Sequence, residues 1–225
     1  MLRQIDTGLW VDEVDFKLIG INFGNRMTCI KLNDGRWCLH SPNKFKAETY
    51  EQLSAMGVIH FLVAPSLMHN LFIMDWKNQQ SSTQVLAPSS AKKLSADQSL
   101  DQLSSKELNN LFNKEITCVP IQGMPVLQEY AFIHHASRSL ILTDLVFNFS
   151  SEVKGWAKLF LKLYGAYNKF GPTLTIRMLI KDKPAFKQSL EQILEHDFDR
   201  VIMSHGAIIE TNGKHRLQQA FKKYL

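Results

Sequence analysis

The stretch GVIHFLVAPSLMH (residues 57–69) joins a glycine, a short apolar run and a terminal histidine. The run VIHFLVA has the length and composition of a strand that is buried on both faces of a sheet. Two later apolar runs also lead to a metal-ligating residue type: SLILTD ends at Asp144, and RVIMSHG contains His205. In α/β sheets, ligands gather beyond strand ends, where residues far apart in sequence meet. We therefore expect His69, Asp144 and His205 to form one site.

The composition indicates one α/β domain over residues 1–225. A chain of this length with 45% hydrophobic residues can bury a sizeable core. Its three cysteines are odd in number and lack CxxC spacing, which argues against a disulfide framework or a cysteine metal site. No apolar stretch approaches the roughly 20 residues of a membrane span, and the first residues are too acidic for a signal peptide. We expect a cytoplasmic protein.

The charge pattern and the motifs narrow the choice of partners. The net charge is +5, but the basic residues are dispersed, and only residues 214–225, KHRLQQAFKKYL, form a local basic patch. No aromatic platform accompanies that patch, so we expect no nucleic-acid partner, and the lack of a span argues against a membrane. The chain also lacks a GxSxG elbow, a phosphate loop and a dinucleotide fingerprint. An unknown small molecule is the expected ligand, and the oligomeric state stays open.

Periodicity and turn signals place the elements. Asn33, Asp34 and Gly35 separate two alternating runs and predict a hairpin. Polar residues 89–114, with four spaced leucines, predict a surface excursion. Apolar spacing predicts further strands and helices. The predicted strands cover about 27–32, 36–40, 58–64, 83–88, 129–135, 139–148 and 200–204, and the predicted helices cover about 45–57, 152–167 and 183–198.

Four segments carry a resemblance to a known family. They are RMTCIKLNDGRWCLHSP (26–42), MGVIHFLVAPSLMHNLF (56–72), EYAFIHHASRSLILTDL (129–145) and DFDRVIMSHGAII (197–209). Together they resemble an uncharacterised bacterial family with a metallo-β-lactamase-like fold, over about Trp10 to Phe221. The resemblance implies a four-layer αββα sandwich, with two mixed sheets face to face, helices outside, and a metal centre at one edge. It implies no particular substrate, because function belongs to the site and not to the fold.

The resemblance also implies that the first metal-binding motif is degenerate. Enzymes of that superfamily carry an HxHxDH motif after a buried strand. With its last histidine matched to His69, the other ligand positions fall on Ala64, Ser66 and Met68. Three of the four ligands are therefore replaced. The site is expected to hold at most one metal ion.

The remaining ligand positions are matched more closely. The next histidine of the superfamily resembles His134 or His135, its bridging aspartate resembles Asp144, and its final histidine resembles His205. We take His69, His134, Asp144 and His205 as candidate ligands. Histidine and carboxylate ligands suit one zinc or iron ion with open positions for water.

Two functions fit these residues. The first is a metal-dependent hydrolase-like protein in which Asp144 is the catalytic residue, holding the metal and orienting water. The alternative is a non-catalytic degenerate member that binds a small molecule or a partner protein. Each residue also has a simpler role: His69 as a hydrogen-bonded loop histidine, Asp144 as a turn cap or partner of Arg138, and His205 as a donor to a backbone carbonyl.

Overall fold

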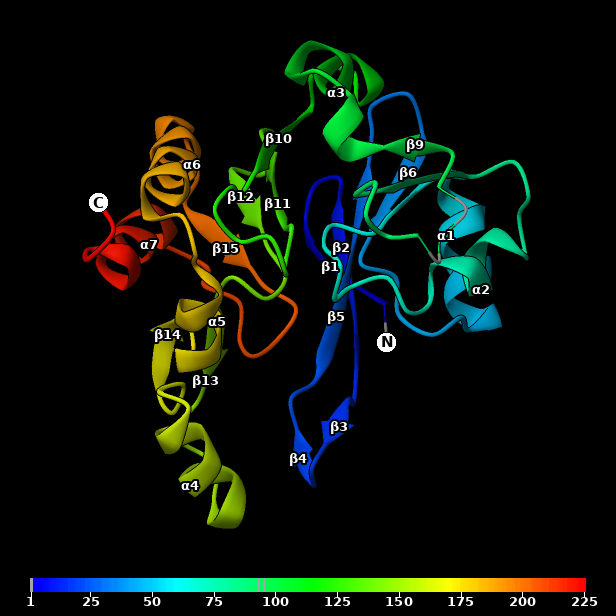
Figure 1. The fold of residues 1–225 in the computed structure, drawn as a ribbon. Helices are drawn as coiled ribbons and strands as arrows, with labels where there is room; N and C mark the ends of the chain where they lie inside the picture. Colours follow the sequence, from blue (N-terminus) through cyan, green and yellow to red (C-terminus); the bar gives the residue numbers. More distant parts are fainter. Residues whose placement is uncertain (1, 93, 95) are drawn as a thin grey trace.

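Two β-sheets pack face to face, and helices cover their outer faces (Figure 1). The structure is a computed structural model that describes residues 2–92, 94 and 96–225. The N-terminal half supplies a seven-stranded sheet and the C-terminal half a four-stranded sheet. The predicted four-layer αββα sandwich is confirmed.

The first sheet is mixed, with the strand order β1-β2-β5-β6-β7-β8-β9. Pairing is antiparallel from β1 to β6 and parallel from β6 to β9. The hairpin expected around Gly35 joins β5 to β6, and Gly35 adopts a positive φ of 84° in its turn. The strands are β1 (Leu2–Asp6), β2 (Leu9–Val14), β5 (Asn25–Lys31), β6 (Arg36–His40), β7 (Val58–Val63), β8 (Gln84–Ala87) and β9 (Gln98–Ser99).

The second sheet has the order β10-β11-β12-β15, and its last pair is parallel. It contains β10 (Ile116–Pro120), β11 (Tyr130–His134), β12 (Ser139–Ile141) and β15 (Arg200–Ile202). Two small ribbons stand apart from both sheets. They are β3 (Lys17–Leu18) with β4 (Ile21–Asn22), and β13 (Phe147–Phe149) with β14 (Lys169–Gly171).

The helices lie outside the sheets, as the resemblance implies. The helices of the N-terminal half are α1 (Ala47–Met56), α2 (Ile73–Lys77), the 3₁₀ turn η1 (Leu100–Gln102) and α3 (Ser105–Leu111). Those of the C-terminal half are α4 (Gly155–Leu163), α5 (Leu174–Leu179), α6 (Lys183–Glu195) and α7 (Gly213–Phe221). Among the described residues, none of these helices combines the length and the apolar character needed to cross a bilayer.

The inner core lies between the sheets because both have apolar inner faces. Phe61 and Val63 of β7 meet Phe132 of β11 in one cluster, which Phe112 completes after α3. Neighbouring residues on β11 point the other way, as strand alternation requires. A sheet that is buried on both faces has near-continuous apolar strands, which is the pattern of residues 58–64.

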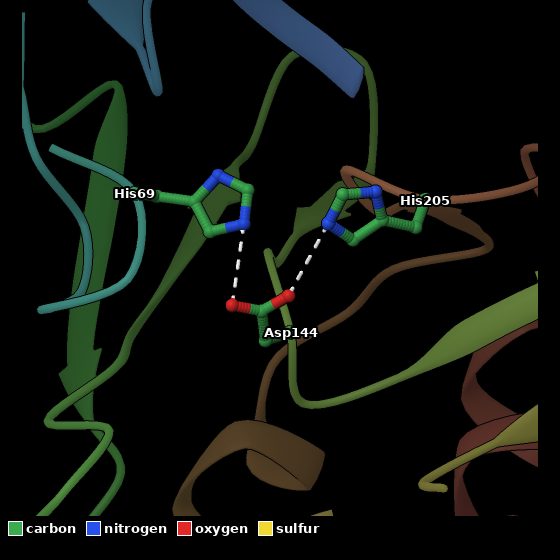
Figure 2. A group of neighbouring side chains, drawn as sticks. All are labelled: His69, Asp144 and His205. Atoms are coloured by element: carbon green, nitrogen blue, oxygen red, sulfur yellow. Dashed lines mark ion pairs between the residues drawn. The ribbon is translucent and has the colours of Figure 1, made fainter. Parts of the chain in front are cut away.

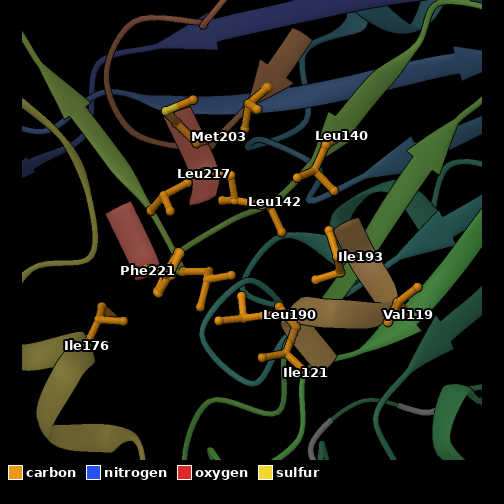
Figure 3. Close-up of a cluster of buried hydrophobic side chains, with 14 of the residues drawn as sticks. Val119, Ile121, Leu140, Leu142, Ile176, Leu190, Ile193, Met203, Leu217 and Phe221 are labelled. Carbon is orange, nitrogen blue, oxygen red and sulfur yellow. The ribbon is translucent and has the colours of Figure 1, made fainter. Parts of the chain in front are cut away.

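The outer clusters hold the helices against the sheets. Trp37 and Leu62 of the first sheet pack with Leu53 of α1 and Trp76 of α2. On the second sheet, residues of β10, β12 and β15 pack with α5, α6 and α7 (Figure 3). This outer cluster contains Val119, Leu140, Ile176, Leu190, Ile193, Leu217 and Phe221.

Three predicted segments differ in detail. The strand expected over 139–148 is interrupted, because β12 ends at Ile141 and β13 covers Phe147–Phe149. The excursion over 89–114 contains β9, η1 and α3, anchored by the buried side chains of Leu100 and Leu108; its residues 93 and 95 lie outside the described residues. The helix expected over 152–167 is shorter, because α4 begins at Gly155 and ends at Leu163.

Candidate metal centre

His69, Asp144 and His205 come together at one edge of the sandwich (Figure 2). His69 Nε2 lies 3.2 Å from Asp144 Oδ2, and His205 Nε2 lies 3.4 Å from Asp144 Oδ1. One ligand atom from each residue can be chosen so that all three lie within 4.8 Å of one another. The three side chains are only 8%, 13% and 9% exposed, in the same order. The predicted convergence of these three residues is confirmed.

His69 lies in the loop after β7, and hydrogen bonds fix both the loop and the ring. The backbone N–H of Leu67 donates to the carbonyl of Leu127, at 3.0 Å. His69 Nδ1 lies 2.8 Å from the hydroxyl of Ser41, which follows β6. Because Nδ1 is engaged, the other ring nitrogen, Nε2, is held toward Asp144.

Asp144 lies in the turn after β12, which the buried carboxylate of Glu129 holds. That carboxylate accepts hydrogen bonds from the backbone N–H groups of Thr143, Asp144 and Leu145, at 2.6–3.0 Å. Burial and the nearby charge of Asp144 raise the pKa of Glu129 to about 8, although the N–H donors act in the opposite direction. Glu129 therefore positions Asp144 without reaching the site itself.

His205 lies in the loop after β15, which Arg26 of β5 fixes. The Arg26 guanidinium donates to the carbonyls of Met203 and Gly206, and its Nε donates to Glu13, at 2.8 Å. Gly206 has a φ of 90°, and a Cβ there would lie 2.3 Å from the carbonyl oxygen of Asn148. Only glycine therefore allows the loop to approach β13 this closely.

A stacking partner and a hydrogen-bond partner together hold the His205 ring. It stacks on Phe147 at a centroid distance of 5.4 Å and an interplanar angle of 6°. Its Nδ1 donates to the carbonyl of Gly24, at 2.7 Å. The simpler role considered for His205, a donor to a backbone carbonyl, is therefore real, and it leaves Nε2 free to face Asp144.

The electrostatics of Asp144 favour the carboxylate. Burial raises its pKa, but the charges and hydrogen bonds of His69 and His205 outweigh burial and hold that pKa well below its ordinary value. Arg138, considered above as a partner of Asp144, instead pairs with Asp197 at 2.8 Å.

The arrangement fits a metal ion because a cation resolves an otherwise unfavourable contact. A carbonyl only accepts, so His205 Nδ1 carries a hydrogen, and in the neutral ring Nε2 presents a lone pair. That lone pair faces a carboxylate oxygen, so either a proton or a cation must lie between them. Two imidazole nitrogens and a carboxylate are a common zinc ligand set, and tetrahedral zinc ligands lie about 3.4 Å apart.

A pocket opens beside these residues, and its walls are mainly apolar. Besides His69, Asp144 and His205, it is lined by Phe16, Asn25, Ser41, Pro42, Met68, Leu71, Phe72 and Thr175. Among the described residues, no lysine or arginine lines it. The site is therefore suited to contact an uncharged part of a ligand.

His134 and His135 do not belong to this group, which corrects the expectation that one of them completes it. His134 is the last residue of β11, at the end of the strand away from Glu129, and it pairs with Ser139 of β12. Its Nδ1 lies 2.7 Å from the hydroxyl of Ser137. His135 is exposed and contacts Thr117. A strand advances about 3.3 Å per residue, so His134 lies at the far end of β11 from the Asp144 turn.

Sequence reasoning missed the residues that hold the three loops: Ser41, Glu129 and Arg26. Glu129 and Arg26 had one usable signal, because each is a charged residue at the border of a strongly apolar run. Charged residues are seldom fully buried unless they are paired. That signal does not name the partner, since Arg26 reaches carbonyls about 180 positions further along the chain.

Comparisons with known proteins agree with this architecture. No family model and no curated protein sequence matches the chain. Among solved structures, a metallo-β-lactamase from Pontibacter korlensis matches with a TM-score of 0.64 at 11% identity, over 99% of this chain and 98% of that one. The DIM-1 metallo-β-lactamase gives 0.67 at 14% identity, over 100% and 97%. FIM-1 from Pseudomonas aeruginosa, in its mono-zinc form, gives 0.63 at 12% identity, over 100% and 96%.

These similarities identify the class of fold. The chain has a metallo-β-lactamase-like fold, with a His-Asp-His cluster of metal-ligating residue types at the edge of its sandwich. Identities of 11–14% extend to the fold alone, so the chemistry must be argued from the site.

Proposed function

We propose that the protein is a metal-dependent hydrolase-like protein whose site holds one zinc or iron ion through His69, Asp144 and His205. One observation carries the proposal: two histidine Nε2 atoms converge on one largely buried carboxylate, while both Nδ1 atoms are engaged elsewhere. Metal-ligating histidines typically have this arrangement, with the second ring nitrogen held by a neighbour.

Each residue has a distinct part in the proposed chemistry. A bound metal ion would polarise an ester, amide or phosphoryl oxygen and lower the pKa of water. Asp144 would serve as a ligand and orient the attacking water. The apolar walls formed by Phe16, Leu71 and Phe72 would hold the uncharged part of the substrate. Met68 stands where the superfamily has an aspartate ligand, which supports a site of at most one metal.

The second candidate is a non-catalytic protein that binds a small molecule or a partner protein at the same pocket. It is favoured by the replacement of three motif ligands by Ala64, Ser66 and Met68, because Ala64 and Met68 bring no good ligand for zinc. The main proposal keeps a metal ion, whereas this alternative needs none.

Metal content separates the two functions. Protein purified without added metal or chelator should contain about one zinc or iron ion per chain, and no second ion, by elemental analysis. His205→Ala should lose most of it, because one of three ligands is gone. His134→Gln is the matched control and should keep the metal, since His134 lies at the other end of β11. If the native protein is metal-free as purified and also fails to bind zinc on titration, the result favours the non-catalytic alternative.

We also propose a cytoplasmic location. Cys29, Cys38 and Cys118 are all free and buried, as is usual for proteins that fold in a reducing compartment.

A further inference from the structure

The outward face of α4 is apolar, although a helix normally turns that face toward the core. Its inner face is already packed: Leu161 and Phe160 contact Phe149 of β13 and Phe23, which follows β4. Trp156, Leu159 and Leu163, at helical spacing, point outward and are 59%, 51% and 63% exposed. These three residues therefore contribute little to the packing of the fold.

Exposed apolar side chains also occur on α5, which begins beside the end of α4. The backbone N–H of Leu174 donates to the carbonyl of Tyr164 at 2.9 Å, which joins the start of α5 to the end of α4. Leu174 and Met178 are 50% and 72% exposed. We call Trp156, Leu159, Leu163, Tyr164, Leu174 and Met178 the α4–α5 patch. Contiguous exposed apolar patches mark interaction sites more often than single exposed residues do.

The charged residues within the segment that carries the patch are all basic, although Glu152 and Asp182 border it. Residues 153–181 contain no aspartate or glutamate, but they contain six basic residues. Among the described residues, none of the six forms an ion pair with a carboxylate. These residues are Lys154, Lys158, Lys162, Lys169, Arg177 and Lys181. The whole chain has +5 over 225 residues, so +6 within this segment is a strong local excess.

The arrangement on α4 matches a helix that lies at a bilayer surface. Lys158 and Lys162 lie beside the apolar row on the exposed side of the helix and sit over the ring of Tyr167. Interfacial helices bury tryptophan and leucine at the headgroup boundary while flanking lysines attract anionic lipids. In Figure 1, α4 projects at the lower end of the molecule, away from α6 and α7.

We propose that the α4–α5 patch docks the protein on the surface of an anionic lipid bilayer. No membrane partner was expected, because the chain has no spanning segment, but surface docking requires none. A protein partner or a second copy would also cover the apolar row, but the excess of unpaired lysine and arginine favours a surface of dense negative charge. The helix α5 contributes to both features, since Thr175 lines the pocket of the candidate metal centre and Leu174 belongs to the patch.

Vesicle sedimentation tests the proposal without a substrate or a metal. The native chain should bind vesicles of phosphatidylcholine with phosphatidylserine, should bind phosphatidylcholine alone much more weakly, and should be released by high salt. Trp156→Ser/Leu159→Ser/Leu163→Ser and Lys158→Glu/Lys162→Glu should each weaken binding by about tenfold or more. Lys222→Glu/Lys223→Glu, an equal charge change just after α7, is the control and should stay within about twofold. The altered residues are exposed, so the thermal unfolding midpoints should remain close to that of the native chain.

Tryptophan fluorescence gives a second measurement. Trp37 and Trp76 are buried and Trp10 packs against Trp37, so Trp156 is the tryptophan that a bilayer would shield. Anionic vesicles should shift the emission to the blue, and Trp156→Phe should abolish the shift.

Absence of binding to anionic vesicles, or equal binding by the patch variants, would overturn the proposal. The proposal would also be overturned if the native chain does not bind vesicles but forms a dimer that the triple serine variant dissociates. Neither experiment requires hydrolysis, so failure of the hydrolase proposal would not affect them.

Discussion

At the scale of single residues, the site depends on where each imidazole directs its second nitrogen. Gly24 and Ser41 engage the Nδ1 atoms of His205 and His69, so both Nε2 atoms face the carboxylate of Asp144. Neither partner belongs to the HxHxDH motif, yet Ser41 orients His69, the one motif ligand that is kept, and Gly24 orients His205.

Met68 is the residue at which a second metal position is most readily restored. It is 56% exposed and lines the pocket beside His69. Met68→Asp adds a carboxylate in place of a thioether that is a poor zinc ligand, so we expect tighter metal binding by titration. Met68→Asn, which is similar in size but uncharged, should give a smaller gain.

The native chain should hold no more than one tightly bound metal ion and should hydrolyse β-lactams little or not at all. Two stoichiometric metal ions in the native protein would contradict the reduced site. If neither the native chain nor Met68→Asp binds a metal ion, His69, Asp144 and His205 are not metal ligands.

At the scale of elements, the site is assembled from loops that follow strands of both sheets. The His69 loop follows β7 of the first sheet, whereas the loops of Asp144 and His205 follow β12 and β15 of the second. Arg26 connects the two sheets directly, because it lies on β5 and binds carbonyls in the loop after β15.

Removing the Arg26 guanidinium should loosen the His205 loop. Arg26→Met leaves the carbonyls of Met203 and Gly206 without their donor, and an unsatisfied buried acceptor costs about 1–3 kcal/mol. We expect the free energy of unfolding in urea to fall by about 2–4 kcal/mol and metal affinity to fall with it.

Arg138→Met is the matched control for this prediction. Arg138 forms an exposed ion pair with Asp197, and such pairs contribute little to stability because solvent screens them. Equal losses of stability in the two variants would mean that Arg26 does not fix the loop.

At the scale of the whole molecule, buried histidines make the fold sensitive to acid. Burial and then the neighbouring charge of His135 lower the pKa of His134 to about 4, although Asp6 acts in the opposite direction. The unfolded chain binds this proton near pH 6.5, so it holds more protons than the folded chain between pH 6.5 and 4. Stability is therefore lost as the pH falls through this window, by roughly 3 kcal/mol from this group. Burial lowers the pKa of His40 to about 3, which adds a loss of the same sign.

Urea unfolding at pH 7 and pH 5 measures this effect. In His134→Gln the decline between the two pH values should be smaller by roughly 2 kcal/mol, because position 134 then carries no imidazole to protonate, while His40 still contributes. His135→Gln, at an exposed neighbour, should reduce the decline much less, because burial, the larger cause of the lowered His134 pKa, remains. A decline in His134→Gln equal to that of the native chain would contradict the assignment.

The sequence by itself determined the local elements and the order in which they occur. Residues 58–63 form a strand because their apolar run suits burial on both faces. The turn at Asn33, Asp34 and Gly35 forms the predicted hairpin between β5 and β6. The strand-end rule also selected His69, Asp144 and His205, since it depends only on where apolar runs stop.

The tertiary structure alone decided which side chains meet and which faces stay exposed. The sequence made both His205 and, with His135 as its competitor, His134 candidate ligands, yet only His205 reaches Asp144, because the direction of β11 carries His134 to its far end. Trp156 and Leu163 have the spacing of a core face, but Leu161 and Phe160 occupy the inner side of α4. Periodicity gives the spacing of apolar residues along an element; which face is buried depends on packing partners that are distant in the chain.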